Sequence, residues 1–193
     1  MIESISERIN TAEPAVGAPA PSWGADLVTQ SGYAFHVRSA SPSDEPALAE
    51  FFTHVDTEDL RFRFLSAIHK VGHDQLRALV SVDHERTKNF LAIEPASGSI
   101  IATAMLAADA TLTNAEIAIA IRADFKRKGI SWTLLDHVAR FAVAKGIKTV
   151  ESMESRENHA AIDLERERGW TASGCPDDPA VMVLRKTLDV ALA

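Results

Sequence analysis

A short basic loop at residues 126–129 carries the most informative chemistry in the sequence. Three consecutive cations precede Gly129, and a long amphipathic helix is expected to begin at the same point. The first turn of a helix exposes unpaired N–H groups at the positive end of the helix dipole, so an anion is stabilised there. Arg122 adds a fourth cation, although the whole chain has a formal net charge of -7. We interpret the loop as a binding site for a pyrophosphate group.

A solvated loop is the common alternative for a run of charges before a helix. Cations at a helix N-terminus oppose the helix dipole by about 0.3–1 kcal/mol each, and here three follow one another without visible compensation. Such a departure from local preference favours a functional site. The loop has neither the GxxxxGK[ST] pattern nor the GxGxxG pattern of the common nucleotide sites, so we exclude those two kinds of site.

Glu116 is the candidate for proton transfer. It lies in the apolar run 115–121, in which three isoleucines alternate with Glu116 and two alanines. The isoleucine face is expected to be buried, and the small-residue face leaves room for a molecule close to the backbone. Burial would raise the pKa of Glu116 toward neutrality, as a base needs. From the residues alone, a glutamate at a strand end that pairs with a nearby Lys or Arg is an equal alternative.

Hydrophobic periodicity predicts the elements that position the loop and Glu116. The pattern is a strand, three helices, three antiparallel-type strands, a long helix, a strand, a charged helix and a final strand. This order predicts an α/β (α+β) fold, in which helices cover a mixed sheet. We place these elements at residues 33–38, about 42–54, 57–65, 73–81, 89–93, 99–107, 115–121, 128–145, 149–153, 158–168 and 180–188. Residues 41–44, Ser-Pro-Ser-Asp, predict the start of the first helix, with an N-cap, a proline at the first helical position and an acid at the third.

The first 32 residues differ in composition from the rest of the chain. They are rich in Ala, Pro, Ser and Gly and show no apolar period. We therefore expect residues 1–32 to form a mobile or loosely docked extension, which Trp23 could pin to the domain. Residues 33–193 are expected to form a single domain, because this length supports one hydrophobic core.

Composition excludes several classes of protein. No apolar run reaches the roughly 20 residues that span a bilayer, and the N-terminus lacks the features of a signal peptide. Cys175 is the one cysteine, which suits a reducing cytoplasm. The acidic balance argues against bulk nucleic-acid binding. No metal site is expected, because Gly72 separates His69 from His73 and no third ligand lies nearby. His137 is expected at the surface of the long helix.

Two motifs resemble those of the GNAT superfamily of acyl-CoA-dependent N-acyltransferases. Residues 126–131, Lys-Arg-Lys-Gly-Ile-Ser, are similar to the family loop [Gln/Arg]-x-x-Gly-x-[Gly/Ala], with departures at Lys126 and Ser131. Asn158 begins an Asn-x-x-Ala pattern that Gly169 and Trp170 follow. The resemblance covers residues 34–188. It implies a GNAT-like, mostly antiparallel sheet of about six to seven strands flanked by helices.

Within that superfamily, the chain looks closest to the acetyltransferase domain of Pat-type protein lysine acetyltransferases. Three stretches carry this resemblance: residues 60–64 (LRFRF), 82–86 (VDHER) and 115–119 (AEIAI). The third is similar to the strand whose glutamate is the general base in that group. The regulatory domains often fused to such modules are absent from the sequence, which puts control through them in doubt.

The resemblance implies acetyl-CoA as co-substrate, with no metal, and assigns roles to particular positions. Glu116 would be the general base, and Asn158 would bind the pantetheine arm or cap its helix. Many family members place a tyrosine at the position of Glu165 to protonate the leaving thiolate, so here thiolate release would fall to water. The remaining contacts with coenzyme A are expected from the strand and the basic loop, namely Ile119, Ala120, Ile121, Lys126, Arg127, Lys128, Gly129, Ile130, Ser131 and Trp132.

The acceptor is expected to be an amine, most favourably a protein lysine such as that of an acyl-CoA synthetase. A small amine, for example a polyamine or an antibiotic, is the alternative within the same class of enzyme. A catalytically weak CoA-binding regulatory module is the alternative outside it. We expect a cytoplasmic monomer or homodimer that binds neither nucleic acid nor membrane.

Overall fold

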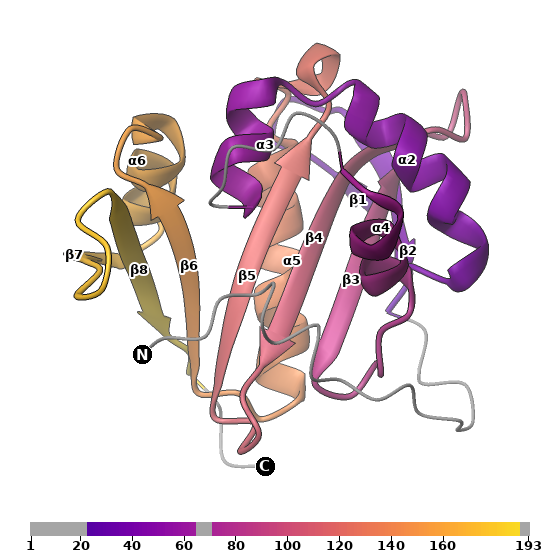
Figure 1. The fold of residues 1–193 in the computed structure, drawn as a ribbon. Helices are drawn as coiled ribbons and strands as arrows, with labels where there is room; N and C mark the ends of the chain where they lie inside the picture. Colours follow the sequence, from indigo (N-terminus) through magenta and orange to yellow (C-terminus); the bar gives the residue numbers. More distant parts are fainter. Residues whose placement is uncertain (1–22, 65–70, 190–193) are drawn as a thin grey trace.

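The computed structural model describes residues 23–64 and 71–189, which form a twisted sheet between two layers of helices (Figure 1). The sheet of the described residues has eight strands in the order β1-β2-β3-β4-β5-β6-β8-β7. All neighbours pair antiparallel except β5 and β6, which are parallel. The strands are β1 (Ala25–Val28), β2 (Ala34–Ser39), β3 (Thr87–Ile93), β4 (Ile100–Ala108), β5 (Asn114–Ile121), β6 (Thr149–Ser155), β7 (Thr171–Gly174) and β8 (Val181–Thr187). The predicted mixed, mostly antiparallel fold is confirmed.

Two hydrophobic cores lie on opposite faces of the sheet. One packs β3–β5 against α5 and α6, and the other packs the same strands against α2, α3 and α4. Figure 1 shows α5 behind β4 and β5, and α4 in front of the sheet. Strand β4 is buried along its whole length because both layers cover it. The helical segments are η1 (Pro42–Asp44), α2 (Glu45–Thr53), α3 (Thr57–Phe64), α4 (His73–Val80), η2 (Ala123–Phe125), α5 (Ile130–Ala144) and α6 (His159–Glu167).

The two strands that the sequence does not predict, β1 and β7, form the two edges of the sheet. The expected number of six to seven strands therefore falls slightly short. Each edge strand has four residues and no fully buried side chain. An edge strand with one bonded neighbour needs little apolar patterning, so hydrophobic alternation does not reveal it.

The position of β1 corrects the predicted boundary of the extension. Residues 25–28 pair with 34–37 of β2, and residues 29–32 form the turn between the two strands, so this part of the predicted extension is a hairpin at the edge of the sheet. Trp23 packs its ring edge-on against Phe141 and His137, with centroids 5.2 Å and 6.2 Å apart. His137 is buried, contrary to the expected surface position, and its Nε2 lies 3.1 Å from the carbonyl oxygen of Trp23. Residues 1–22 lie outside the described residues.

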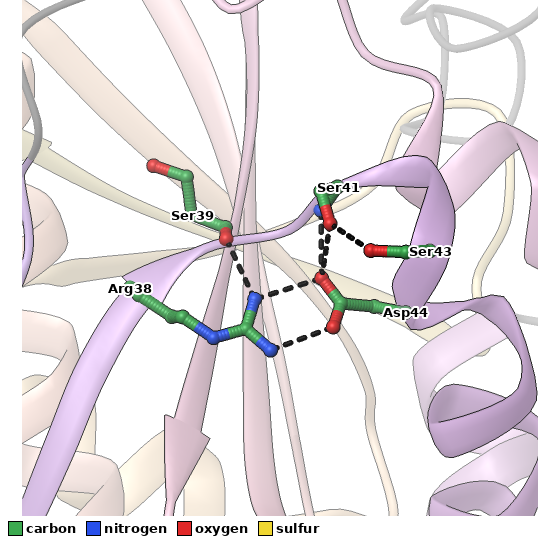
Figure 2. A network of polar contacts seen from close by, with 5 residues as sticks. All are labelled: Arg38, Ser39, Ser41, Ser43 and Asp44. Carbon is green, nitrogen blue, oxygen red and sulfur yellow. Dashed lines mark hydrogen bonds and ion pairs between the residues drawn. The ribbon is translucent and has the colours of Figure 1, made fainter.

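A buried carboxylate joins the end of β2 to the first helical layer (Figure 2). The guanidinium of Arg38 donates to both oxygens of Asp44, at 2.7 Å and 2.6 Å. The backbone N–H and the hydroxyl of Ser41 donate to the same carboxylate at 2.8 Å and 2.9 Å. The predicted helix start at residues 41–44 is thus confirmed. Hydrogen bonds from Arg38, with those from Ser41, hold the pKa of Asp44 below its usual value in spite of burial.

Replacing Asp44 with asparagine is expected to lower the free energy of unfolding at pH 7 by about 1–2 kcal/mol, because Arg38 loses a charged partner but is partly exposed. The pKa of Asp44 is lower in the folded chain than in the unfolded chain. The stabilisation of the fold by the Asp44 carboxylate is therefore complete above about pH 4. It is lost as the pH falls through the pKa of Asp44 in the folded chain. Urea unfolding between pH 7 and pH 3 should show a weaker acid dependence in D44N. D163N, which affects an exposed pair with Arg166 at 4.0 Å, is the control and should match the parent chain.

Candidate functional site

The central feature of the site is the divergence of two parallel strands. β5 and β6 pair only between residues 114–116 and 149–151, and beyond these residues the strands separate (Figure 1). A cavity of about 620 Å³ occupies the opening and is lined by β5 and β6, by the N-terminal half of α5, by α6 and by Asp59 of α3. It therefore reaches both helical layers. A space of this size accommodates an extended ligand.

Glu116 lies at the point where the strands separate. It is 5% exposed and lines the cavity. The predicted alternation of β5 is confirmed in part: Ile117 packs in the core beside α5, and Ala120 packs in the core beside α2 and α4. The isoleucine face is not fully buried as expected, because Ile119 and Ile121 are half-buried at the cavity. Glu116 shares the face of Ala120, so its carboxylate is on the side of the sheet that α3 covers. Its neighbour in register on β6, Glu151, is neutralised by Arg185 at 2.7 Å.

The loop before α5 has an unusual backbone. Arg127 and Gly129 have positive φ angles, of 62° and 81°, and no side chain caps the helix. Within the described residues, no backbone or side-chain oxygen accepts the N–H groups of residues 127–132, whereas the N–H of Thr133 already donates to Gly129. A Cβ atom at residue 129 would lie 3.3 Å from Cβ of Thr29, so the β1–β2 turn closes tightly over this glycine. Amide groups in this arrangement suit a phosphate oxygen.

Three of the four cations assigned to this loop have protein partners. The ammonium of Lys126 lies 2.5 Å from Asp56 and 2.7 Å from Asp59. Burial lowers the pKa of Lys126, but the hydrogen bonds to the two carboxylates outweigh it and leave the pKa above its usual value. Arg122 pairs with Asp124 at 3.0 Å.

Lys128 does not line the cavity. Its ammonium lies 4.1 Å from the ring centroid of Phe125, and its carbonyl accepts a hydrogen bond from Ser31 at 2.9 Å. Arg127 is exposed at the cavity and is the one of the four cations for which the described residues supply no partner. For binding an anion, the loop therefore offers mainly its backbone N–H groups, together with the guanidinium of Arg127.

Helix α6 contributes two polar side chains to the cavity. Asn158 caps the helix: its Oδ1 accepts from the N–H of Ala161 at 3.4 Å, and its Nδ2 donates to Glu154 at 2.8 Å. Glu165 is 6% exposed, and the hydroxyl of Ser152 on β6 donates to it at 2.5 Å. Burial raises the pKa of Glu165 to about 7, although the hydrogen bond from Ser152 opposes this rise.

The structure gathers all the site residues expected from sequence except Lys128 around one cavity. Nine further residues line it that were not among the expected catalytic and binding residues: Asp59, Ile117, Ala118, Phe125, Leu135, Met153, Glu154, Ala161 and Glu165. From sequence, Glu165 was identified only as the position of the family tyrosine and was given no role. Its burial could have been expected, because Glu165 follows Ala161 and Ile162 at helical spacing and so lies on the buried stripe of α6. That these residues bind coenzyme A stays a prediction.

Neither a metal cluster nor a membrane-spanning helix is found in the described part of the chain. Residues 23–64 and 71–189 contain no group of three His, Cys, Asp or Glu side chains that could hold a metal ion. In the same residues, no helix is both long enough and apolar enough to cross a bilayer. His69, half of the histidine pair considered from sequence, lies outside the described residues.

Comparison with known proteins identifies relatives of this architecture. A family model described as the acetyltransferase (GNAT) family matches residues 50–170, more than half of the chain. A Pseudomonas aeruginosa protein named as an acetyltransferase is 24% identical over 154 residues, which is 79% of this chain and 83% of that protein.

Solved structures share the fold. The GNAT domain of S. lividans PAT superposes with a TM-score of 0.81 at 23% identity, covering 89% of this chain and 100% of that domain. Spermidine N-acetyltransferase from Vibrio cholerae, solved with CoA and spermine, gives a TM-score of 0.66 at 15% identity, over 82% of this chain and 98% of that protein. These identities support a common fold, and the acceptor must be argued from the site.

Proposed function

Because this chain belongs to the GNAT family of acetyltransferases, which use acetyl-CoA, we propose that it transfers the acetyl group directly to the side-chain amine of a protein lysine. The observation that carries the proposal is the position of Glu116. It is buried at the point where β5 and β6 separate, inside a cavity that begins at the amide groups before α5. A donor thioester that enters from α5 and an amine that enters from α3 would meet beside this carboxylate.

Glu116 supplies what an amine acceptor needs. A lysine amine has a pKa near 10.4, so removing its proton at pH 7 costs about 4–5 kcal/mol. Glu116 accepts that proton as the amine attacks the thioester carbonyl. Backbone N–H groups of Ile119 and Ile121 are placed on the same strand to stabilise the carbonyl oxygen as it becomes negative. Amide groups of residues 127–132, with Arg127, hold the pyrophosphate.

Two observations support a protein lysine as the acceptor. The motifs at residues 82–86 and 115–119 resemble the Pat-type group, and the S. lividans PAT domain matches along its entire length. The cavity also opens toward α3, where Asp59 lies at its wall and is paired with Lys126 at 2.7 Å, so a substrate lysine could exchange with Lys126 there.

Thiol-release kinetics with acetyl-CoA test this acceptor. The expected result is rapid release with an acyl-CoA synthetase that carries a modifiable lysine, and no release above background with its Lys→Arg variant or with spermidine. Mass spectrometry of the intact synthetase should show one added acetyl group. Release with spermidine but not with the synthetase would contradict the proposal.

A polyamine is the second candidate acceptor. Asp56 and Asp59 on the α3 side are held by Lys126, and a polyamine could replace that ammonium with its own charges. The resemblance in fold to the Vibrio cholerae spermidine enzyme agrees with this alternative. The same kinetic panel separates the two acceptors.

A further inference from the structure

A second carboxyl group lies in the cavity and has no role in the transfer as described so far. Glu165 projects from the second turn of α6, is 6% exposed and lines the same cavity as Glu116. Its hydrogen-bond partner is a neutral hydroxyl, that of Ser152. The ion pairs of the described residues include none with Glu165, so no cation compensates a negative charge there.

Glu116 and Glu165 approach the opening from opposite faces of the sheet. Glu116 is on the face that α2, α3 and α4 cover. Ser152 is one residue further along β6 than Glu151, the register partner of Glu116, and consecutive residues of a strand point to opposite faces. Glu165, bonded to Ser152, therefore lies on the face of α5 and α6. A thioester in the opening between β5 and β6 has one carboxyl group on each side.

The charged groups on the elements around Glu165 are engaged elsewhere. They form two ion pairs, Arg168 with Asp136 at 3.1 Å and Arg185 with Glu151 at 2.7 Å. The ammonium of Lys186 donates to the carbonyl of Arg168 at 3.0 Å, and the carboxylate of Glu154 accepts from Asn158 at 2.8 Å. The other charged residues of α6, Asp163, Arg166 and Glu167, are exposed. Within the described residues, the hydroxyl of Ser152 is therefore the polar group that contacts the carboxyl group of Glu165.

We propose that Glu165 is the general acid of the reaction and protonates the sulfur of the departing coenzyme A. The inference rests on the proposed amine acetylation. The amine lone pair forms the new carbon–nitrogen bond, and Glu116 takes the proton that the nitrogen loses. As the carbon–sulfur bond breaks, its electron pair goes to sulfur, and the carboxyl proton of Glu165 moves to the sulfur to give a thiol. Solvent then returns a proton to Glu165 and removes one from Glu116, so the enzyme is restored.

The acidity of Glu165 suits this role. Its pKa of about 7 leaves a large fraction protonated at neutral pH. An alkyl thiol has a pKa near 8.5, so proton transfer from this carboxyl group to a thiolate is favourable by about 2 kcal/mol. Two carboxyl groups whose surroundings give them different proton affinities are a recurrent basis for acid and base roles in one site.

Glu165→Gln tests the proton donation. Glutamine keeps the size of the side chain and an oxygen for Ser152 but has no acidic proton. We expect kcat to fall about 100-fold at pH 7, at the low end for general acids because a thiolate is a good leaving group. The parent enzyme is expected to lose kcat/KM above pH 7 as Glu165 loses its proton, and this decrease should be absent in E165Q. Affinity for acetyl-CoA and the melting temperature should stay unchanged. Glu167→Gln, on the exposed side of the same helix, is the matched control.

The pH profile of Ser152→Ala distinguishes a general acid from a purely structural residue, because a structural role of Glu165 would leave that profile unchanged. Without the hydroxyl, the pKa of Glu165 should rise, so the alkaline decrease of kcat/KM should move to higher pH while kcat is kept within about twofold. Parent-like rates and pH profiles in both variants would overturn the proposal, even if the parent enzyme acetylates amines. If the parent enzyme releases no thiol with any amine, the proposed function itself fails.

Discussion

Replacing Glu116 with glutamine is expected to lower kcat at pH 7 by about 10²–10⁴-fold, because the amine then loses its proton without a positioned base. The substitution keeps the shape of the side chain, and the pyrophosphate contacts lie elsewhere. Calorimetry should therefore give the same Kd for acetyl-CoA as for the parent enzyme. The rate deficit should shrink as the pH rises toward the pKa of the free amine, since the acceptor is then increasingly unprotonated.

Glu151→Gln is the matched control for this experiment. Glu151 is the register partner of Glu116 on the neighbouring strand, but its carboxylate is bound by Arg185 and does not line the cavity. Its loss should change stability slightly and leave kcat within a few-fold. Equal rates for E116Q and the parent enzyme would remove Glu116 from the mechanism.

Replacing Gly129 with alanine is expected to weaken acetyl-CoA binding about 10-fold or more. The residue has a φ of 81°, which costs an L-residue about 1–2 kcal/mol, and the new Cβ would press against Thr29 at 3.3 Å. Either the loop shifts or Thr29 moves, and the amide groups before α5 lose their alignment. The Kd for CoA, measured by calorimetry, is the readout.

A control substitution at Gly146, just past the other end of α5, distinguishes loss of binding from the effect of backbone strain. Gly146 also has a positive φ, of 78°, but a Cβ there would meet nothing within 4 Å. G146A should therefore lose about the same stability from strain and keep the parent affinity for CoA. Equal affinities in G129A and G146A would contradict the assignment of the loop as the pyrophosphate site.

The central part of the fold could be predicted from sequence because it is strongly patterned. β4 runs apolar and β5 alternates, and the core stripe of α5 ends just before Gly146, which follows the C-cap of the helix. The edge strands β1 and β7 could not be predicted, since one bonded neighbour and short length leave almost no pattern. His137 was misplaced for a related reason: its partner, Trp23, is 114 residues away, and no local rule anticipates that contact.

At the candidate site, sequence reasoning predicted which residues line the cavity better than it predicted which residues pair with one another. It found the loop, β5 and Asn158, because residue type and local spacing indicate a helix start and a strand. It treated the cations as a cluster, whereas the structure binds Lys126 to two carboxylates of α3 and places Lys128 on an aromatic ring. Such pairings depend on which elements meet in space. The environment of Glu165 is likewise a tertiary property, since its burial comes from packing α6 on β6.

The turn between β1 and β2 also matters for how the chain can be shortened. Thr29 and Ser31 contact the loop before α5, and Trp23 packs on the same helix. A protein begun at residue 33 would lack this support beneath the N-terminal end of α5, where we propose that the pyrophosphate binds. Its β2 would also present an unsatisfied row of peptide groups to other molecules. The Ala-, Pro-, Ser- and Gly-rich part of the chain thus includes residues that support the start of α5. A domain boundary placed by composition alone would remove these residues.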